Sequence, residues 1–486
     1  MVGAASAAGR HSTQRLRKYY GGQMASEFVA TPEEIARVRA AVAEHGIERV
    51  LIGGADIHGQ FRAKFIPAWR FENEPTAAMH IADVLAIMDI EDGMMPRPSG
   101  YEGWWPTWDA GFDDLDAVPD LSTFTPVSWI DKGALVLCDY LDQEHQPLSA
   151  MPRNVLRRMV QHAGSMGFEP LMTTEFEFFV FKETFGSAKA KGFRNLDVLG
   201  ESVTMYGAEQ AHADLPLTSA IEKACGDMGI RIEAIMAEGG PSQFELNLTP
   251  QPALRAADEG FLFKFAVKRV AAELGYFASF MPKFGPGEFG SSLHVHQSLW
   301  SGERNAFYDA SRPDGLSVVA RQYIAGMTKT LREFTAMYAP YITSYKRFEA
   351  DSAAGSQVAW AVGNRTTAIR AIRGPEGATR VENRTPGSDG NPYLVLAAML
   401  AGGLWGIEND LDPGEAYAGN AYADEHVESV PRSLQEATEL FAQSEVANKM
   451  LGEEAVSYYA ETRRWEVEQF NSAVTDWELN RYIGNA

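Results

Sequence analysis

Apolar and polar residues alternate along four separate segments of the chain, which is the pattern of β-strands with one buried face. The segments are residues 174–181, 243–248, 290–299 and 379–384. One such strand by itself usually belongs to a sheet with a solvated face. Solvated faces mostly carry Lys, Thr, Ser and Gln, whereas these four carry carboxylates, imidazoles and guanidinium groups. The four segments together therefore predict a chemical site.

The polar positions of these segments, and the turn before the second one, supply candidate metal ligands. They are Glu175, Glu177, Glu238, Glu245, His294 and Glu382. Oxygen ligands with one imidazole suit Mg²⁺ or Mn²⁺ better than a structural zinc ion, which prefers thiolates and several imidazoles. Five carboxylates cannot share a buried site unless cations neutralise them. A pair of divalent ions would do so, and such pairs clamp phosphoryl groups during transfer.

Arginines in the last third of the chain could provide the opposing charge. They are Arg347, Arg365, Arg370, Arg380 and Arg384. The planar guanidinium group binds carboxylate and phosphate in bidentate fashion, as a nucleotide and an acidic substrate would require. The alternative is a solvated or structural network of ion pairs.

Apolar residues at helical spacing predict the remaining elements. Helices are expected at residues 31–46, 152–166, 210–228, 253–274, 317–337 and 392–407, and in the charged tail at 433–482. Residues 49–67 predict a hairpin with Asp56 at the end of its first strand, where an Asp is most often an Asx-turn residue. We expect a flexible extension at residues 1–30, a small α+β domain at 31–148, and a larger domain at 149–486 that holds the four chemical strands.

Composition restricts the class of protein. The 486 residues include 43 basic and 65 acidic ones, a net charge of −22, which disfavours nucleic-acid binding because phosphate contacts need basic patches. Two cysteines do not make a disulfide framework, so a reducing cytoplasm is expected. The longest apolar runs are shorter than the roughly 20 residues that a membrane span needs, and the N-terminus lacks the apolar core of a signal peptide.

The motifs resemble those of the glutamine synthetase superfamily, in the family's order and over roughly residues 35–486. They are Glu175-Phe-Glu177, Glu238-Gly-Gly-Pro-Ser-Gln-Phe-Glu245, Gly290-Ser-Ser-Leu-His294-Val-His296-Gln-Ser298, Ser344-Tyr-Lys-Arg347, Asn364-Arg365-Thr-Thr-Ala-Ile-Arg370 and Arg380-Val-Glu382-Asn-Arg384. The resemblance is to type I-like members. It implies an α+β architecture, with a small N-terminal β-grasp domain followed by a catalytic α/β half-barrel. It also implies stacked rings, with a dodecamer expected, and active sites between subunits.

The resemblance also implies roles for individual residues. One metal ion would be held by Glu177, Glu238 and Glu245, and another by Glu175, His294 and Glu382, with two or three Mg²⁺ or Mn²⁺ ions per site. ATP would contact His296, Ser298, Arg370 and Arg380, with Arg365 on the transferred phosphate. Glutamate would be bound by Gly290, Arg347 and Arg384. A neighbouring subunit would lend Asp56, which would attract and deprotonate the amine.

The sequence departs from glutamine synthetase where ammonium would bind. The family's flap glutamate is replaced by Ala353, with Glu349 and Asp351 nearby but out of register. Phe289 replaces an asparagine, and Gly377 replaces a lysine associated with ATP. A roomier, less polar pocket lined by Phe289 and Ala353 fits a bulkier amine better than ammonium.

We therefore expect a γ-glutamyl-amide synthetase, similar to the members that join glutamate to polyamines, ethanolamine, alkylamines or anilines. Phe289 and the Trp104-Trp105 pair favour an apolar or aromatic amine. Two alternatives remain, glutamine synthetase itself and a non-catalytic structural or regulatory ring. Tyr422 lies near the position of the family's modified tyrosine, and we expect it to be an ordinary surface residue.

Overall fold

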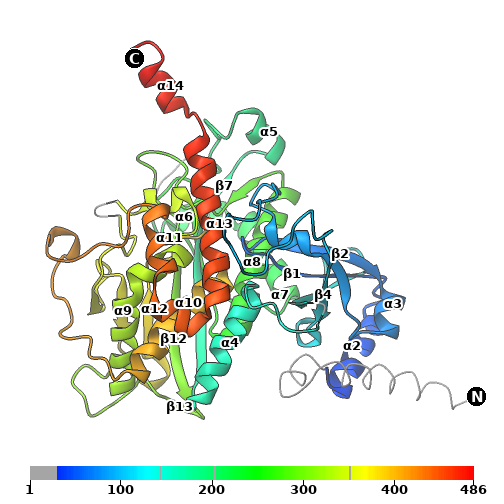
Figure 1. Ribbon diagram of the computed structural model, residues 1–486, viewed down its shortest axis with the longest axis horizontal. Helices are drawn as coiled ribbons and strands as arrows, with labels where there is room; N and C mark the ends of the chain where they lie inside the picture. Colours follow the sequence, from blue (N-terminus) through cyan, green and yellow to red (C-terminus); the bar gives the residue numbers. More distant parts are fainter. Residues whose placement is uncertain (1–29, 143, 201–203, 350–351, 486) are drawn as a thin grey trace, which may run out of the picture.

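Two β-sheets and the helices around them make up the computed structural model (Figure 1), which describes residues 30–142, 144–200, 204–349 and 352–485. The expected extension at residues 1–30 lies outside the described residues, apart from Ala30, and so does Asp351. The two sheets are described in turn, because the second one carries the candidate site.

The N-terminal sheet has six strands. They are β1 (Arg49–Ala55), β2 (Phe61–Pro67), β3 (Met79–Ala82), β4 (Asp114–Pro119), β5 (Thr125–Val127) and β6 (Gly133–Leu141). Their order is β2-β1-β6-β4-β3, with β5 paired to β6. Strands β1 and β2 form the predicted antiparallel hairpin, and β1 runs parallel to the fully buried β6.

The second sheet has ten strands, in the order β14-β15-β16-β12-β7-β9-β8, with β10 and β11 paired to β7 and β13 paired to β12. The strands are β7 (Glu169–Phe181), β8 (Ile232–Ala237), β9 (Gln243–Leu248), β10 (Gln251–Pro252), β11 (Phe277–Ser279), β12 (Leu293–Ser301), β13 (Arg304–Asn305), β14 (Trp360–Val362), β15 (Ile369–Ile372) and β16 (Arg380–Asn383). All four segments predicted from alternation are strands of this one sheet.

Helices surround the sheets (Figure 1). They are α2 (Pro32–Glu44), α3 (Ala68–Asn73), α4 (Pro152–Ser165), α5 (Phe185–Ala190), α6 (Ala208–Ala213), α7 (Leu215–Asp227), α8 (Ala253–Glu273), α9 (Val318–Tyr338), α10 (Pro392–Glu408), α11 (Leu434–Ala442), α12 (Glu445–Leu451), α13 (Glu453–Ser472) and α14 (Asp476–Tyr482). Short 3₁₀ turns lie at Asp83–Ile87, Leu121–Thr123, Ile342–Arg347, Glu376–Ala378 and Ala421–Ala423.

The apolar face of the ten-stranded sheet is the core of the larger part of the molecule. Phe176 of β7 stacks on Phe263 of α8, with 5.2 Å between ring centroids, and Phe178 lies 5.1 Å from Phe280. On β12, Gln297 belongs to this apolar face, where Tyr323 of α9 donates a hydrogen bond to it. Because one face is filled in this way, the polar side chains of the same strands must lie on the other face.

The predicted helices are present, with one interruption. Thr31 caps α2 by accepting a hydrogen bond from the backbone N–H of Glu34, as its position before Pro-Glu-Glu indicated. The helix expected at 210–228 is instead divided into α6 and α7 at Asp214, two residues before Pro216 in the first turn of α7. The charged tail is helical as expected, and it consists of α11, α12, α13 and α14.

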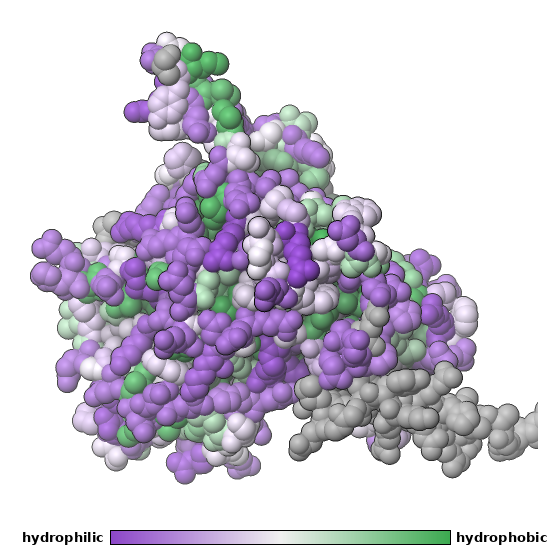
Figure 2. All heavy atoms as spheres, viewed as in Figure 1, coloured by the Kyte–Doolittle hydropathy of each residue, from purple (hydrophilic) through white to green (hydrophobic). Residues whose placement is uncertain are grey.

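The helix α10, the longest apolar run of the sequence, is buried along nearly its whole length. Among the described residues, no helix is both long and apolar enough to cross a membrane. The face of the molecule in Figure 2 is mostly hydrophilic, and apolar side chains gather on the C-terminal projection that carries α14. Three of its most exposed residues are Val474, Trp477 and Ile483.

Candidate active site

The register of the ten-stranded sheet places the candidate ligands beside one another. Opposite Glu175 of β7 lies His294 of β12, and opposite Glu177 lies Glu245 of β9. The other edge of β12 pairs with β16, so that His296 lies opposite Glu382. Since alternate residues of a strand point to the same face, the polar faces of these strands meet.

Glu175 lies at the centre of the group. One of its oxygens is 2.7 Å from Nδ1 of His294, and the other is 3.6 Å from Nε2 of His296. Two sets of three possible metal ligands occur here, and both contain Glu175. Within each set, the three ligand atoms lie within 4.8 Å of one another. The first set adds Glu245 and His294, and the second adds His296 and Glu382. His296 therefore lies with the candidate ligands, although the resemblance associated it with ATP.

Glu177 and Glu238 adjoin this group. Glu177 accepts a hydrogen bond of 2.7 Å from the backbone N–H of Ser292, and Glu238 accepts one of 3.0 Å from the N–H of Gly239. Burial raises the pKa of Glu238, and the negative charge of Glu177 raises it further. The six residues predicted from sequence are thus gathered on one face of the sheet.

The protein compensates the carboxylates unequally. Burial opposes the ionisation of Glu175, but the hydrogen bond with His294 and the nearby imidazole of His296 outweigh it and lower the pKa of Glu175. Burial likewise acts on Glu382, but nearby cations, Arg384 foremost, lower its pKa to about 2.

At Glu245 the balance is reversed. Its burial, reinforced by the charges of Glu175, Glu177 and Glu238, raises the pKa of Glu245 to about 9. The ionised form of Glu245 is therefore disfavoured unless a cation is added beside it. The carboxylates Glu238 and Glu245 form the uncompensated end of the cluster.

The donor set fits divalent cations. Nε2 of His294 is buried and has no hydrogen-bond partner among the described residues, as expected of an imidazole nitrogen reserved for a ligand. The carboxylates around it carry more negative charge than the protein neutralises. Oxygen-rich ligands with one or two imidazoles suit Mg²⁺ and Mn²⁺.

Two of the predicted arginines flank the cluster at Glu382. Arg370 on β15 lies 2.8 Å from one oxygen of Glu382, and Arg384 lies 2.6 Å from the other. Both guanidinium groups keep a buried Nε–H without a partner among the described residues. These donors are available to an anion at the same place.

Arg347 is held beside Gly290. A Cβ atom added to Gly290 would lie 2.4 Å from Cγ of Arg347, so only glycine leaves room for this side chain. Arg347 donates to Oγ of Ser292 at 3.0 Å and to the carbonyl of Thr385, and its buried Nε–H has no partner within the described parts of the chain. Burial lowers the pKa of Arg347 to about 10, so it remains a cation at neutral pH.

The flap that follows Arg347 contacts the arginines through its backbone. The carbonyl of Ala353 accepts a hydrogen bond of 3.2 Å from Arg384, and that of Ala354 accepts one of 3.3 Å from Arg347. Glu349, a candidate substitute for the flap glutamate, instead forms an ion pair of 3.0 Å with Lys283. Glu349 is therefore already neutralised.

The remaining candidates for nucleotide binding are spread along the edge of the cluster. Nε of Arg380 lies 3.2 Å from Nδ1 of His296. Ser298 is buried on the same face of β12 and accepts a hydrogen bond of 2.9 Å from the indole of Trp300. Arg365 is exposed in the turn between β14 and β15.

Asp56 is separate from this cluster within the chain. It is almost fully buried at the end of β1, where it accepts hydrogen bonds from the backbone N–H groups of His58 and Gln60 and from Nε of Arg62, at 2.8–2.9 Å. This is the Asx-turn arrangement that its position favoured. The catalytic role implied by the resemblance, which needs a second copy of the chain, stays a prediction.

Two other expectations fit the structure poorly. The Trp104-Trp105 pair was expected to favour an apolar or aromatic amine, but Trp105 is buried and both rings lie against Tyr458 of α13, at 6.3 and 5.4 Å. The pair therefore belongs to the packing between the N-terminal part and the C-terminal helices. Tyr422 is half-buried with an enclosed hydroxyl, rather than a plain surface tyrosine.

The site also includes residues that were not among the predicted site residues. Asn247 of β9 donates through Nδ2 to Glu175 and so fixes its orientation. Lys283 forms the ion pair with Glu349. Asp389 accepts a hydrogen bond of 2.6 Å from the hydroxyl of Ser344. Asn247 shares the polar face of its strand with Glu245, and this alternation could have identified it.

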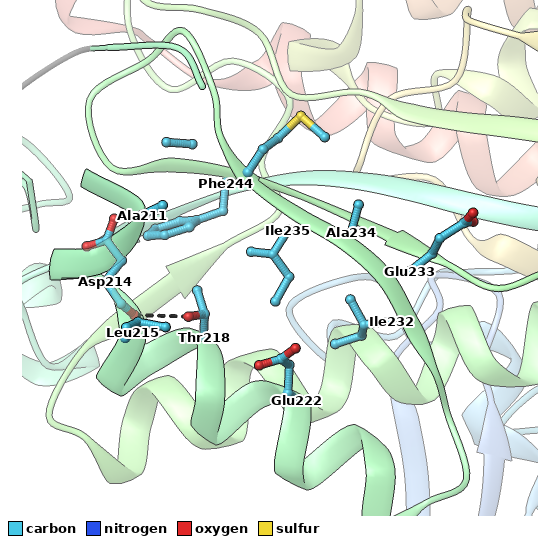
Figure 3. A pocket seen from close by; sticks show the side chains of 12 residues that line it. Ala211, Asp214, Leu215, Thr218, Glu222, Ile232, Glu233, Ala234, Ile235 and Phe244 are labelled. Atoms are coloured by element: carbon cyan, nitrogen blue, oxygen red, sulfur yellow. Dashed lines mark hydrogen bonds between the residues drawn. The ribbon is translucent and has the colours of Figure 1, made fainter. Parts of the chain in front are cut away.

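A separate hollow of about 270 Å³ lies between α6, α7 and the edge strand β8 (Figure 3). Apolar side chains line most of it, among them Ile232, Ile235 and Phe244. Phe244 directly precedes Glu245 on β9, so its ring points to the opposite face from the carboxylates. The hollow is therefore distinct from the carboxylate cluster.

Comparison with known proteins agrees with this geometry. Residues 149–482 match the family described as glutamine synthetase, catalytic domain. Several full-length relatives are more than 30% identical to the chain. The protein therefore belongs to the glutamine synthetase family, and the predicted resemblance is confirmed.

Two relatives are named for amide synthesis. A glutamate–isopropylamine ligase of a Pseudomonas species is 37% identical over 455 residues, which cover 93% of this chain and 98% of the relative. The γ-glutamylethanolamide synthetase GlnA4 of Streptomyces coelicolor is 34% identical over 451 residues, 93% of this chain and 96% of the relative. A glutamine synthetase of Thermotoga maritima is 35% identical over 403 residues, 81% of this chain and 90% of the relative.

Solved structures show the same fold. The ligand-free enzyme GmaS superimposes with a TM-score of 0.79 at 28% identity, and a complex of GmaS with ADP with a TM-score of 0.80 at 27% identity. Each alignment covers 92% of this chain and 99% of the solved chain. The predicted mixed α/β architecture with a curled half-barrel sheet is confirmed.

Proposed function

We propose that the protein is an ATP-dependent ligase that joins the γ-carboxylate of glutamate to an amine. The γ-phosphoryl group of ATP passes to a carboxylate oxygen, which gives γ-glutamyl phosphate and ADP. The amine nitrogen then attacks the acyl carbon, phosphate leaves with the bonding electrons, and the nitrogen loses a proton. The observation that carries the proposal is the pair of ligand sets that share Glu175 beside arginines with unpaired donors.

The carboxylate cluster would hold two or three divalent ions. Glu177, Glu238 and Glu245 would bind at one end, and Glu175, His294 and Glu382 at the other. When bound, Mg²⁺ or Mn²⁺ ions would neutralise the charge of the transferring phosphoryl group. Asn247 orients Glu175 through its side-chain amide.

The arginines would divide the two anionic substrates between them. Arg347 and Arg384 would bind the carboxylates of glutamate, and Gly290 would leave the space in which Arg347 reaches them. Arg370, Arg380, His296 and Ser298 would contact ATP, and the exposed Arg365 would contact the phosphate in transfer. Among the described residues, Arg347, Arg370 and Arg384 each keep a buried Nε–H without a partner, which supports the binding of anionic substrates beside them.

An amine is a better acceptor for this site than ammonium. Ala353 contributes only a backbone carbonyl to the flap, and Glu349 is paired with Lys283. Phe289 stands beside Gly290 with about half of its surface exposed. A glutamine synthetase that uses ammonium is the alternative. A non-catalytic homologue is disfavoured, because all six candidate ligands are present and converge.

The organisation of the protein completes the proposal. We assign residues 31–148 to a β-grasp domain and 149–486 to the catalytic domain, in a cytoplasmic ring of subunits, expected to be a dodecamer. The exposed Val474, Trp477 and Ile483 on the C-terminal projection support self-association, since isolated chains rarely expose such groups together. Light scattering tests this, and a monodisperse monomer would contradict it.

The activity is tested by phosphate release from ATP and glutamate with Mg²⁺. Amines such as isopropylamine, n-butylamine and ethanolamine are each compared with ammonium. We expect amines to stimulate release and to appear as γ-glutamyl amides in the products. Release stimulated by ammonium alone would instead identify a glutamine synthetase. Glu382→Ala should abolish turnover, and retained turnover would refute the metal assignment.

A further inference from the structure

An apolar lip borders the carboxylate cluster. It consists of Met205, Gly239 and Phe289. A Cβ atom placed on Gly239 would lie 2.8 Å from Cε1 of Phe289 and 3.1 Å from Cε of Met205, so the ring and the thioether methyl both rest on this glycine. Phe289 is nevertheless 53% exposed and Met205 47% exposed. The lip therefore presents apolar surface outward while its inner side is fixed.

The lip is directly connected to the groups that would do the chemistry. The N–H of Gly239 donates to Glu238 at 3.0 Å, so one side of the lip adjoins the uncompensated end of the cluster. On the other side Phe289 precedes Gly290, whose carbonyl accepts a hydrogen bond of 2.8 Å from Gln243. Gly290 in turn contacts Arg347. Phe289 is thus held between the candidate metal site and the candidate glutamate site.

No free carboxylate on the flap faces this region among the described residues. Glu349 is paired with Lys283, and the flap reaches Arg347 and Arg384 through backbone carbonyls. A second ammonium group on an acceptor would therefore find no unpaired carboxylate on the described part of the flap, and the nearby Glu238 would already be engaged with the candidate metal site, so the loss of hydration would be unfavourable. An alkyl or aryl substituent would gain by covering Phe289 and Met205.

We propose that the apolar lip selects the acceptor amine, and that the acceptor is a primary amine with an apolar alkyl or aryl substituent rather than a diamine, polyamine or amino alcohol. This inference rests on the proposed function and names the substrate class of the same site. Phe289 is the specificity-determining residue, and Gly239 is the position that lets its ring and Met205 approach the backbone next to Glu238.

Three acceptors of equal chain length test the proposal. They are n-butylamine, 4-amino-1-butanol and 1,4-diaminobutane, which differ only in the group at the far end. Amide formation is measured with the full-length enzyme, ATP, glutamate and Mg²⁺ at one pH, and kcat/KM for the diamine is halved to allow for its two amino groups. We expect n-butylamine to exceed the diamine by at least about tenfold, the discrimination that an apolar pocket provides for one or two methylene groups.

Variants of Phe289 separate recognition from folding. Phe289→Ser should raise the KM for n-butylamine roughly tenfold and narrow its advantage over the diamine, while the KM values for glutamate and ATP stay unchanged. Phe289→Leu should restore most of the preference. Phe185→Ala is the matched control, because Phe185 is equally exposed but lies on α5 against Phe193 and Phe277.

The outcomes are distinct. If every amine is inactive and only ammonium is consumed, the proposed function fails. If amines are ligated but the diamine or the amino alcohol is preferred, the function stands and the selection by the lip is wrong. Unchanged selectivity in a folded, active Phe289→Ser enzyme would also overturn it, because the ring would then be covering something other than the acceptor.

Discussion

The contact between Gly290 and Arg347 gives a sharp test of how glutamate is bound. In Gly290→Ala the new Cβ would lie 2.4 Å from Cγ and 3.0 Å from Cδ of Arg347, and 3.3 Å from the carbonyl oxygen of Pro282. Carbon atoms in contact are separated by about 3.5–4.0 Å, so the side chain must move by about 1 Å. It cannot move freely, because Ser292 and the carbonyls of Ala354 and Thr385 hold its guanidinium group.

A misplacement of about 1 Å in a substrate-positioning group costs about 100-fold in rate, which corresponds to about 2.7 kcal/mol. We therefore expect kcat/KM for glutamate to fall about 100-fold in Gly290→Ala, with the affinity for ADP nearly unchanged. The overpacking should lower the free energy of unfolding by about 1–3 kcal/mol.

Steady-state kinetics and urea unfolding of the same preparation separate the two effects. Gly226→Ala in α7 is the control, since a Cβ there meets no atom within 4 Å, and alanine should stabilise the helix by about 0.5–1 kcal/mol without changing kinetics. A Gly290→Ala enzyme with wild-type kinetics for glutamate would refute the placement of Arg347 at the substrate.

Three further predictions concern charge. The raised pKa of Glu245 means that the stability of the metal-free protein falls as pH rises from about 4.5 to about 9. In Glu245→Gln, the unfolding temperature measured in EDTA should therefore depend less on pH, and Mn²⁺ should stabilise the protein less. An unchanged stabilisation by Mn²⁺ would contradict the assignment of Glu245 as a ligand. Burial, together with the charge of Lys268, lowers the pKa of Lys264 to about 7, so Lys264 makes the free energy of unfolding increase as pH rises from about 7 to 10.5. Lys264→Met should remove this increase. If the free energy of unfolding still increases with pH in the variant, another group is responsible. Asp56→Asn keeps the turn but loses the bond to Arg62 and the carboxylate expected to take the proton of the amine, so we expect a loss of about 2 kcal/mol in urea unfolding together with a large fall in kcat; a wild-type kcat in the folded variant would contradict the catalytic role.

The sequence determined which side chains share a face of each strand, because the period of a strand is two residues. Alternation alone therefore placed Glu175 with Glu177, and His294 with His296. It could not supply the register between strands more than a hundred residues apart, on which the pairing of His294 with Glu175 depends. The resemblance to the family indicated that the six candidate ligands converge, and the structure gave the distances between them.

Residues whose partners are distant in sequence were the ones misjudged. Trp104 and Trp105 were expected to favour an apolar or aromatic amine, yet both rings lie against Tyr458, some 350 residues later in the chain. Lys283 was not predicted at all, because nothing near it in the sequence indicates its ion pair with Glu349. Local pattern says which face a residue occupies but not what covers that face.

The two ends of the carboxylate cluster are neutralised to different extents, which affects where a cation would bind first. At one end Glu382 pairs with Arg370 and Arg384, whereas at the other end no Lys or Arg side chain of the described residues forms an ion pair with Glu238 or Glu245. Cation binding should therefore be most favourable at the Glu238 and Glu245 end. Glu382 would supply oxygens to a cation, and Arg370 and Arg384, which now pair with Glu382, would then offer their N–H groups to the anionic substrates. The same two arginines thus stabilise the buried Glu382 and would bind the anionic substrates, so replacing either arginine should weaken both the cluster and substrate binding.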